Sequence, residues 1–416
     1  MPQLFQLKVK IFFIIYALFA FNQVIAGNAT ALYNVDVLVK NESANTRWGA
    51  LKNGLDEVFV RISGDSIVMD KLKRPPASRY VKQYSYEPVE NPVLDDKGMV
   101  LSHLLKIQYD GRSMEKYLRD NAFPVWGEHR ADVVIWLAIR DGKNEYVLKS
   151  TDQSVIKAAA DTALQRRGIS ERWPLYDSKD KKIIKVADIR GGFKDPIIAA
   201  SKRYSRGPAL TGSLIWNGKK WQSSWSLLMV SGDKLWSIED ADYNSLISKA
   251  VDRAADAMGV VFAIHGVGKN QQLITAQLEI QAVNSIKKYR KLENYLQGLS
   301  AVVTVKPLKV DDQSAIFEVV LRSSEEDFLN LVKNDAELTY VEPIYVEPTK
   351  KQKPAQVSAE KNQRVVNDLA VESSAITKKI DNTTATAKDN TANNAVNPLP
   401  EDVTPQLPIY HYKLNN

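Results

Sequence analysis

The sequence predicts an α/β protein of the α+β kind, with three small mixed units in series, the third ferredoxin-like, and a disordered C-terminal tail. Short apolar runs with strand period alternate with runs of helical spacing. The composition, 44% hydrophobic and 9% aromatic over 416 residues, suffices for two or three buried cores, and the final segment is strongly polar. The expected parts are a signal peptide (1–26), an N-terminal α/β unit (27–142), a second α/β unit with a β-meander and a closing helix (143–268), the ferredoxin-like unit (269–347) and the tail (348–416).

The N-terminus has the order of a secretory signal peptide. Lys8 and Lys10 precede the apolar run 11–21, and the small residues Ala26 and Gly27 follow. This run is about half of the roughly 20 residues that a membrane span needs, so an uncleaved anchor is the weaker alternative. We expect cleavage near Ala26, no integral membrane segment afterwards, and localisation in the bacterial periplasm.

The composition also restricts the chemistry and the partners. The chain has no cysteine, which excludes disulfides, thiol nucleophiles and cysteine-based zinc sites. Its formal net charge of +7 is spread among acidic residues and forms no basic stripe. We therefore expect no nucleic-acid partner, and at most attraction to an anionic envelope surface or peptidoglycan.

The N-terminal unit begins with an alternating strand over 32–39 and continues with a helix. Apolar residues from Trp48 to Ile62 recur at helical spacing, Asn41 or Ser43 is a suitable N-cap, and Ser63-Gly64-Asp65 would end the helix. Two strands, a polar loop between them and a short helix should complete the unit, with the strands over 80–87 and 101–109 and the helix carrying Met114, Tyr117 and Leu118.

The stretch 123–142 leads from this unit into an apolar run. Pro124 stops a helix and Gly127 permits a turn, after which 132–139 reads as a strand that is buried on both faces and closes the N-terminal unit. Two interpretations of the turn remain open. Its side chains fill and fix the end of a core, or they bind a ligand in a cleft; the candidates are Trp126, His129 and Arg130.

The second and third units have clear patterns. The second should contain a helix over 152–167, a helix start at Asp195-Pro196, hairpin turns at Asn217-Gly218 and 231–233, and a closing helix from Leu246 to Met258. The third reads as βαββαβ, a ferredoxin-like order. Its expected strands are 275–282, 301–305, 315–321 and 338–345, with helices over 286–299 and around Phe328.

Past Glu347 the chain is too polar to bury a core, so we expect disorder over 348–416. One apolar patch near its end contains Tyr410 and Tyr412. This patch is either incidental or a short docking peptide, which makes the two tyrosines further candidate binding residues.

Residues that could carry catalysis are few. Of the four histidines only His129 lies at a turn between elements, and no nucleophile, zinc or phosphate-loop motif occurs. A group of four carboxylates could bind a hard cation, but helix caps and turns are the commoner use of such residues; the group is Asp177, Asp180, Asp188 and Asp195. We expect no catalytic residue, no cofactor and no metal.

Several dispersed motifs resemble the bacterial exported family of the domain of unknown function 2066, over about residues 30–345. They are the segments 60–65, 123–127 with 136–138, 191–193 with 200–204, Trp221 with Trp225, and 251–256. The resemblance implies export in Gram-negative bacteria and no known activity.

Two functions follow as hypotheses. The first is a non-enzymatic accessory or adaptor protein of the cell envelope that binds envelope proteins of unknown identity. The alternative is a periplasmic enzyme or glycan-binding protein that uses a cleft near Trp126, His129 and Arg130. An enzyme should bring these side chains together in a pocket, whereas an adaptor should hold them packed or hydrogen-bonded in place.

Overall fold

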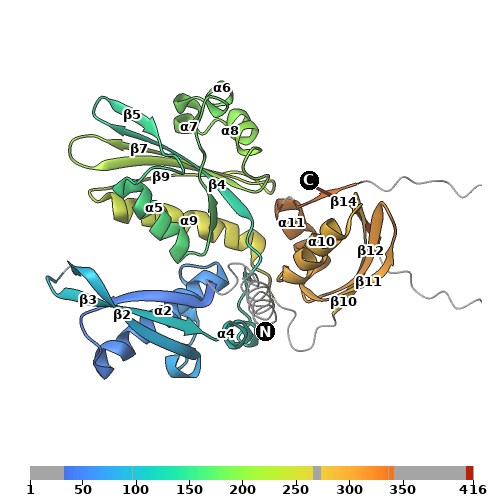
Figure 1. Cartoon of the computed structure of the whole chain (residues 1–416), viewed down its shortest axis with the longest axis horizontal. Helices are drawn as coiled ribbons and strands as arrows, with labels where there is room; N and C mark the ends of the chain where they lie inside the picture. Colours follow the sequence, from blue (N-terminus) through green and yellow to red (C-terminus); the bar gives the residue numbers. More distant parts are fainter. Residues whose placement is uncertain (1–31, 96, 266–272, 336, 342–408, 416) are drawn as a thin grey trace, which may run out of the picture. The chain divides into compact units, whose positions relative to one another are not determined.

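Three β-sheets with packed helices make up the part of the chain that the computed structural model describes, namely residues 32–95, 97–265, 273–335, 337–341 and 409–415 (Figure 1). The mixed α/β class predicted from the sequence is confirmed. The expected signal peptide and residues 348–408 of the expected tail lie outside the described residues. No helix in the described ranges combines the length and apolar character of a membrane span.

The N-terminal sheet has the strand order β1-β3-β2 and is antiparallel throughout. β2 runs on to Leu94, through the stretch with Pro88 and Pro92 that the sequence predicts as a loop. It is an edge strand, where proline is tolerated, and its pairing with β3 is irregular between Pro88 and Val93. The elements are β1 (Asn34–Val39), α2 (Ala44–Ser63), α3 (Val68–Lys71), η2 (Ala77–Arg79), β2 (Val81–Leu94), β3 (Val100–Tyr109) and α4 (Gly111–Asp120).

Helix α2 begins and ends where its sequence predicts. The Ser43 side chain accepts a hydrogen bond from the N–H of Thr46, and Gly64 ends the helix with a φ of 72°. Leu55 on its inner face is fully buried. Trp48, expected on this face, is 53% exposed. Helical spacing predicts which side of the helix faces the sheet. It does not predict whether the sheet extends far enough to cover a residue near the start of the helix.

The second sheet has the order β5-β4-β7-β8-β9, with β6 paired beside β4. β4 runs parallel to β7 and antiparallel to β5, so it belongs to this sheet and does not close the N-terminal one. Its apolar run indicates a central strand without specifying its partners. The strands are β4 (Asp132–Asp141), β5 (Asn144–Val147), β6 (Ser170–Arg172), β7 (Ala209–Trp216), β8 (Trp221–Leu228) and β9 (Lys234–Asp240).

Helices cover both faces of this sheet (Figure 1). Ile135 and Leu137 of β4 face one core with α5 and α9, while Val134 and Trp136 face a second core with α7 and α8. The predicted two-sided burial of this strand is thus confirmed. The helices are α5 (Val155–Arg166), α6 (Asp180–Ile183), α7 (Val186–Gly191), α8 (Lys194–Ser201) and α9 (Tyr243–Phe262).

The third sheet has the order β11-β12-β10-β14-β13. The predicted βαββαβ elements are present, but a fifth strand from the end of the chain lies between the first and the fourth. The sequence predicts residues 409–414 to be part of a disordered tail, and this part of the prediction is wrong, because they form a strand. The elements are β10 (Ile274–Gln281), α10 (Ile286–Gly298), β11 (Val302–Val310), β12 (Ser314–Leu321), α11 (Glu325–Asp335), β13 (Leu338–Tyr340) and β14 (Ile409–Leu414).

Candidate functional site

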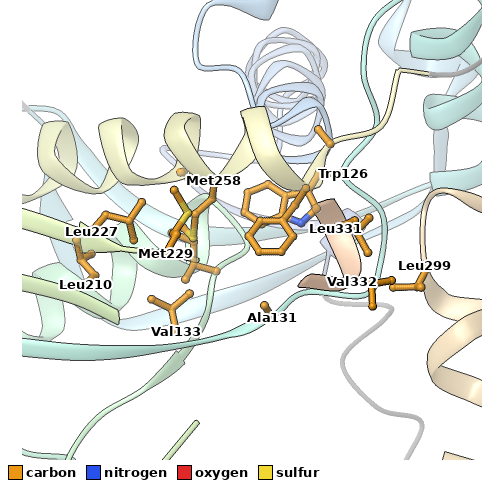
Figure 2. Packing of buried hydrophobic residues seen from close by; sticks show 14 of the residues in the cluster. Trp126, Ala131, Val133, Leu210, Leu227, Met229, Met258, Leu299, Leu331 and Val332 are labelled. Carbon is orange, nitrogen blue, oxygen red and sulfur yellow. The ribbon is translucent and has the colours of Figure 1, made fainter. Parts of the chain in front are cut away.

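Trp126 lies within the core at the turn that leads into β4. It is 3% exposed, and its ring stacks on that of Phe262 with centroids 5.8 Å apart and planes 11° apart. The same apolar cluster contains Met258 of α9 and Leu331 and Val332 of α11 (Figure 2). Trp126 therefore fills the end of a core, as the first interpretation of this turn predicts. Its ring is not available to a ligand from solvent.

Arg130 ties the turn to the end of helix α2. Its guanidinium lies 3.8 Å from the centre of the Trp126 ring and donates hydrogen bonds to the carbonyl oxygens of Gly127, Trp126 and Arg61. Burial lowers the pKa of Arg130, and the neighbouring cations Arg61 and Arg167 act in the same direction. Most donors of this side chain are used within the protein, although Nη1 has no partner among the described residues. A half-buried cation with carbonyl partners is a structural anchor.

His129 joins the same turn to helix α11. Its Nε2 lies 2.7 Å from Oδ2 of Asp335, whose side chain is only 3% exposed, and its ring meets Tyr295 edge to face at 5.0 Å. Burial lowers the pKa of His129, but the hydrogen bond and charge of Asp335, together with the charges of Glu337 and Asp132, outweigh this effect, so the pKa lies above its ordinary value. A protonated His129 and an ionised Asp335 would form a charge-assisted hydrogen bond.

A pocket of about 410 Å³ opens beside this pair. Polar side chains from several segments line it, and the turn between α8 and β7 provides the largest share. The lining residues are His129, Arg130, Ala131, Asp132, Lys202, Arg203, Tyr204, Ser205, Arg206, Gly207, Lys291, Asp335, Glu337 and Asn415.

The turn between α8 and β7 is held against the start of β4. The Ser205 hydroxyl donates to the carbonyl oxygen of Asp132 at 3.0 Å and accepts from the N–H of Gly207 at 2.9 Å. A Cβ at position 207 would come within 2.6 Å of the same carbonyl oxygen. Only glycine allows this approach, so the wall of the pocket has a defined backbone conformation.

The charges of the pocket divide into paired and unpaired groups. Arg203 binds Asp177 and Asp180, and Lys291 lies 2.8 Å from Glu337. Lys202 and Arg206 are exposed and make no ion pair with any residue that the structure describes. The pocket thus offers two unpaired cations, which suits an anionic ligand.

The four carboxylates considered as a cation site do not come together as one set of ligands. Asp177 and Asp188 accept hydrogen bonds from backbone N–H groups at turns and helix starts. Asp180 is fully buried and accepts from Arg203 and from the hydroxyl of Tyr204. Within the described ranges, no cluster of three or more potential metal ligands occurs.

The structure places the two candidate tyrosines of the tail in β14, in the third sheet. Tyr412 is 3% exposed and Tyr410 is partly buried, and both pack on the core. Asn415, which follows this strand, lines the pocket beside His129, but the tyrosines themselves do not line it. Sequence reasoning missed Lys202 and Arg206, although three cations within five residues before a Gly-Pro pair signal a basic turn.

A comparison with known protein families gives a match at the start of the chain. Residues 26–127 match a family described as Domain of unknown function (DUF8605), which is a different family from the domain of unknown function 2066. The predicted resemblance to the latter is wrong. The motifs behind that resemblance are common local features: Gly64 and Gly192 end helices, and Trp126 is buried in a core. Unrelated proteins share such features. No curated protein matches the chain.

Proposed function

We propose that the protein is a non-enzymatic accessory or adaptor protein of the bacterial cell envelope, exported to the periplasm, where it binds other envelope proteins. The proposal is supported by the contacts of Trp126, His129 and Arg130, the candidate binding residues of the turn before β4. Trp126 is stacked and buried, Arg130 donates to three carbonyl oxygens, and His129 is bonded to a buried carboxylate. Side chains held in this way stabilise a joint between segments.

Crosslinking in cells tests the binding of partners. Cells that produce the wild-type protein are crosslinked, and the proteins that co-purify are identified by mass spectrometry, with fractionation and N-terminal sequencing in parallel. We expect envelope proteins, a periplasmic location and Gly27 as the first residue. We also expect His129→Ala to retain the same partners as long as it stays folded. A folded His129→Ala protein that has lost a catalysed reaction of the wild type would contradict the proposal, as would a cytoplasmic protein that begins at Met1.

A second candidate function is the binding of an anionic glycan, such as a peptidoglycan fragment, in the pocket beside His129. The unpaired cations Lys202 and Arg206 favour it, because a carboxylated sugar would supply the missing counter-charge. The charge reversals Lys202→Glu and Arg206→Glu together should abolish binding of an acidic muropeptide in calorimetry. The double variant Lys219→Glu, Lys234→Glu changes the net charge equally outside the pocket and should bind as the wild type does. Equal binding by all three proteins would exclude this site.

A further inference from the structure

Strand β14 occupies an internal position in the third sheet. It pairs in parallel with β10, from Gln277 opposite Ile409 to Gln281 opposite Lys413. On its other side it pairs antiparallel with β13, from Leu338 opposite Leu414 to Tyr340 opposite Tyr412. The backbone of β14 is therefore hydrogen-bonded on both sides, as in strand addition by a bound peptide.

Strand β14 fills a slot between β10 and β13, and along it buried side chains alternate with more exposed ones. Tyr412 and Leu414 are 3% and 4% exposed and belong to the core, and the Tyr412 ring meets that of Tyr340 at 5.9 Å. Lys413, which lies between them, is exposed, and Nδ1 of His411, at the alternate position before Tyr412, lies 3.1 Å from a carboxylate oxygen of Glu279 on β10. The slot thus selects an extended segment with apolar side chains at every second position and a basic or imidazole group between them.

The connection from β13 to β14 is far longer than their pairing requires. Antiparallel neighbours are commonly joined by about two to five residues. Here residues 341–408 intervene. An extended chain spans at most roughly 3.3–3.6 Å per residue, so a link of this length can reach the slot of a neighbouring molecule as well as its own.

We propose that β14 is exchangeable and that the slot between β10 and β13 of one copy accepts β14 of a second copy. The proposal is independent of the functions considered above. A β14 in the slot of its own chain and a β14 in the slot of another copy make the same strand pairs and core contacts. The balance between them therefore depends on the effective concentration of the tethered strand. For a tether this long, that concentration is on the order of millimolar at most. A copy at micromolar concentration should mostly fill its own slot, and exchange should grow with concentration.

Engineered cysteines test the exchange in the full-length chain, which has none of its own. Thr339 and Lys413 are exposed register partners on β13 and β14. Directly opposite residues in such a pair have Cα atoms roughly 4.5–5.5 Å apart, within reach of a disulfide. The double variant Thr339→Cys, Lys413→Cys should form an internal disulfide on oxidation, which verifies the strand register.

The two single variants are then mixed, incubated at increasing concentration and oxidised. We expect disulfide-linked dimers that contain one chain of each kind, with a yield that rises at least several-fold between about 10 μM and 1 mM. A mixture of Thr339→Cys with Lys219→Cys reports random collisions and should yield far fewer. Adding Tyr412→Ala to the Lys413→Cys chain should lower the yield, whereas Ile409→Ala, at a position that is 52% exposed, should lower it less.

Two results would overturn the proposal. The first is an internal disulfide in the double variant together with a mixed yield that never exceeds the collision control at millimolar concentration. That combination would mean that each strand stays in its own chain. The second is the absence of the internal disulfide in a folded double variant, which would remove β14 from the slot altogether.

Discussion

Trp126 has the largest side chain in the turn before β4, and its removal should destabilise the protein. Trp126→Ala deletes a ring that contacts both Phe262 and the Arg130 guanidinium, and we expect the free energy of unfolding to fall by about 3–5 kcal/mol. Thermal and urea unfolding measure the change. Trp48→Ala provides the matched control, because Trp48 is 53% exposed and its loss should stay within about 0.5 kcal/mol. Equal stability of the two variants would show that Trp126 does not support this core.

His129 should make the stability depend on pH. Its pKa in the folded chain is raised above the ordinary value of about 6.5. The stability that it contributes is therefore fully present below pH ~6.5 and declines as the pH rises through the raised value. We expect the melting temperature of the wild type to fall across that window relative to His129→Gln, which can still donate a hydrogen bond to Asp335 but does not titrate.

The control for this measurement is His129→Ala. It leaves the buried carboxylate of Asp335 without its partner and should lower the free energy of unfolding by about 1–3 kcal/mol. Parallel pH profiles of the melting temperature in the wild type and His129→Gln would refute the titration of His129 as a source of stability.

Helices α2 and α9 meet through two glycines. A Cβ on Gly259 would lie 2.3 Å from the carbonyl oxygen of Gly64, and one on Gly64 would lie 2.7 Å from the Cα of Gly259. Gly259→Ala must therefore push backbone against backbone, and we expect a loss of several kcal/mol in the free energy of unfolding. Gly49→Ala, in the exposed interior of α2 with open space around it, should stabilise the protein by up to about 1 kcal/mol. A neutral Gly259→Ala would mean that the helices can separate at this point without cost.

Sequence reasoning works best for elements whose signals are local. Ser43 and Gly64 mark the ends of α2, and the Asn217-Gly218 pair marks the hairpin between β7 and β8, because a side-chain cap and a positive φ are properties of a few neighbouring residues. The apolar run of β4 likewise indicates burial on both faces.

Strand partners are less predictable, because they depend on residues distant in the sequence. The residues 132–139 do not show whether their strand pairs with β7 or with β3. The residues 409–414 do not show that their strand pairs with β10. The candidate site shows the same division. The turn with Trp126, His129 and Arg130 is visible in the sequence, but Asp335 as the partner of His129 is not, and neither is the part of Lys202 and Arg206 in the pocket beside it.

For the whole molecule, the position of β14 changes what limited proteolysis should produce. The sequence alone predicts trimming to a core that ends near Glu347. With β14 in the third sheet, we expect a cut between 348 and 406 to leave two pieces that stay together, namely the core and a short fragment with Tyr412 and Leu414 buried in it. Native mass spectrometry should detect both pieces in one complex, and denaturant should separate them.

The control for proteolysis is Tyr412→Ala, which removes a buried ring from the fragment and should release it more readily after the same cut. Recovery of a folded wild-type core without the fragment would show that the covalent link, and not the slot, keeps β14 in place.

Because the chain is synthesised from its N-terminus, the late position of β14 affects how the third sheet forms. β10 is complete long before its parallel neighbour has been made, because β10 ends at Gln281 and β14 begins only at Ile409. Until then one edge of the third sheet lacks its partner, and an unpaired edge invites association with other chains. Parallel pairing between segments so far apart forms slowly. A tag or a nonsense mutation near residue 408 should therefore impair the solubility of newly made protein more than changes of similar size elsewhere on its surface.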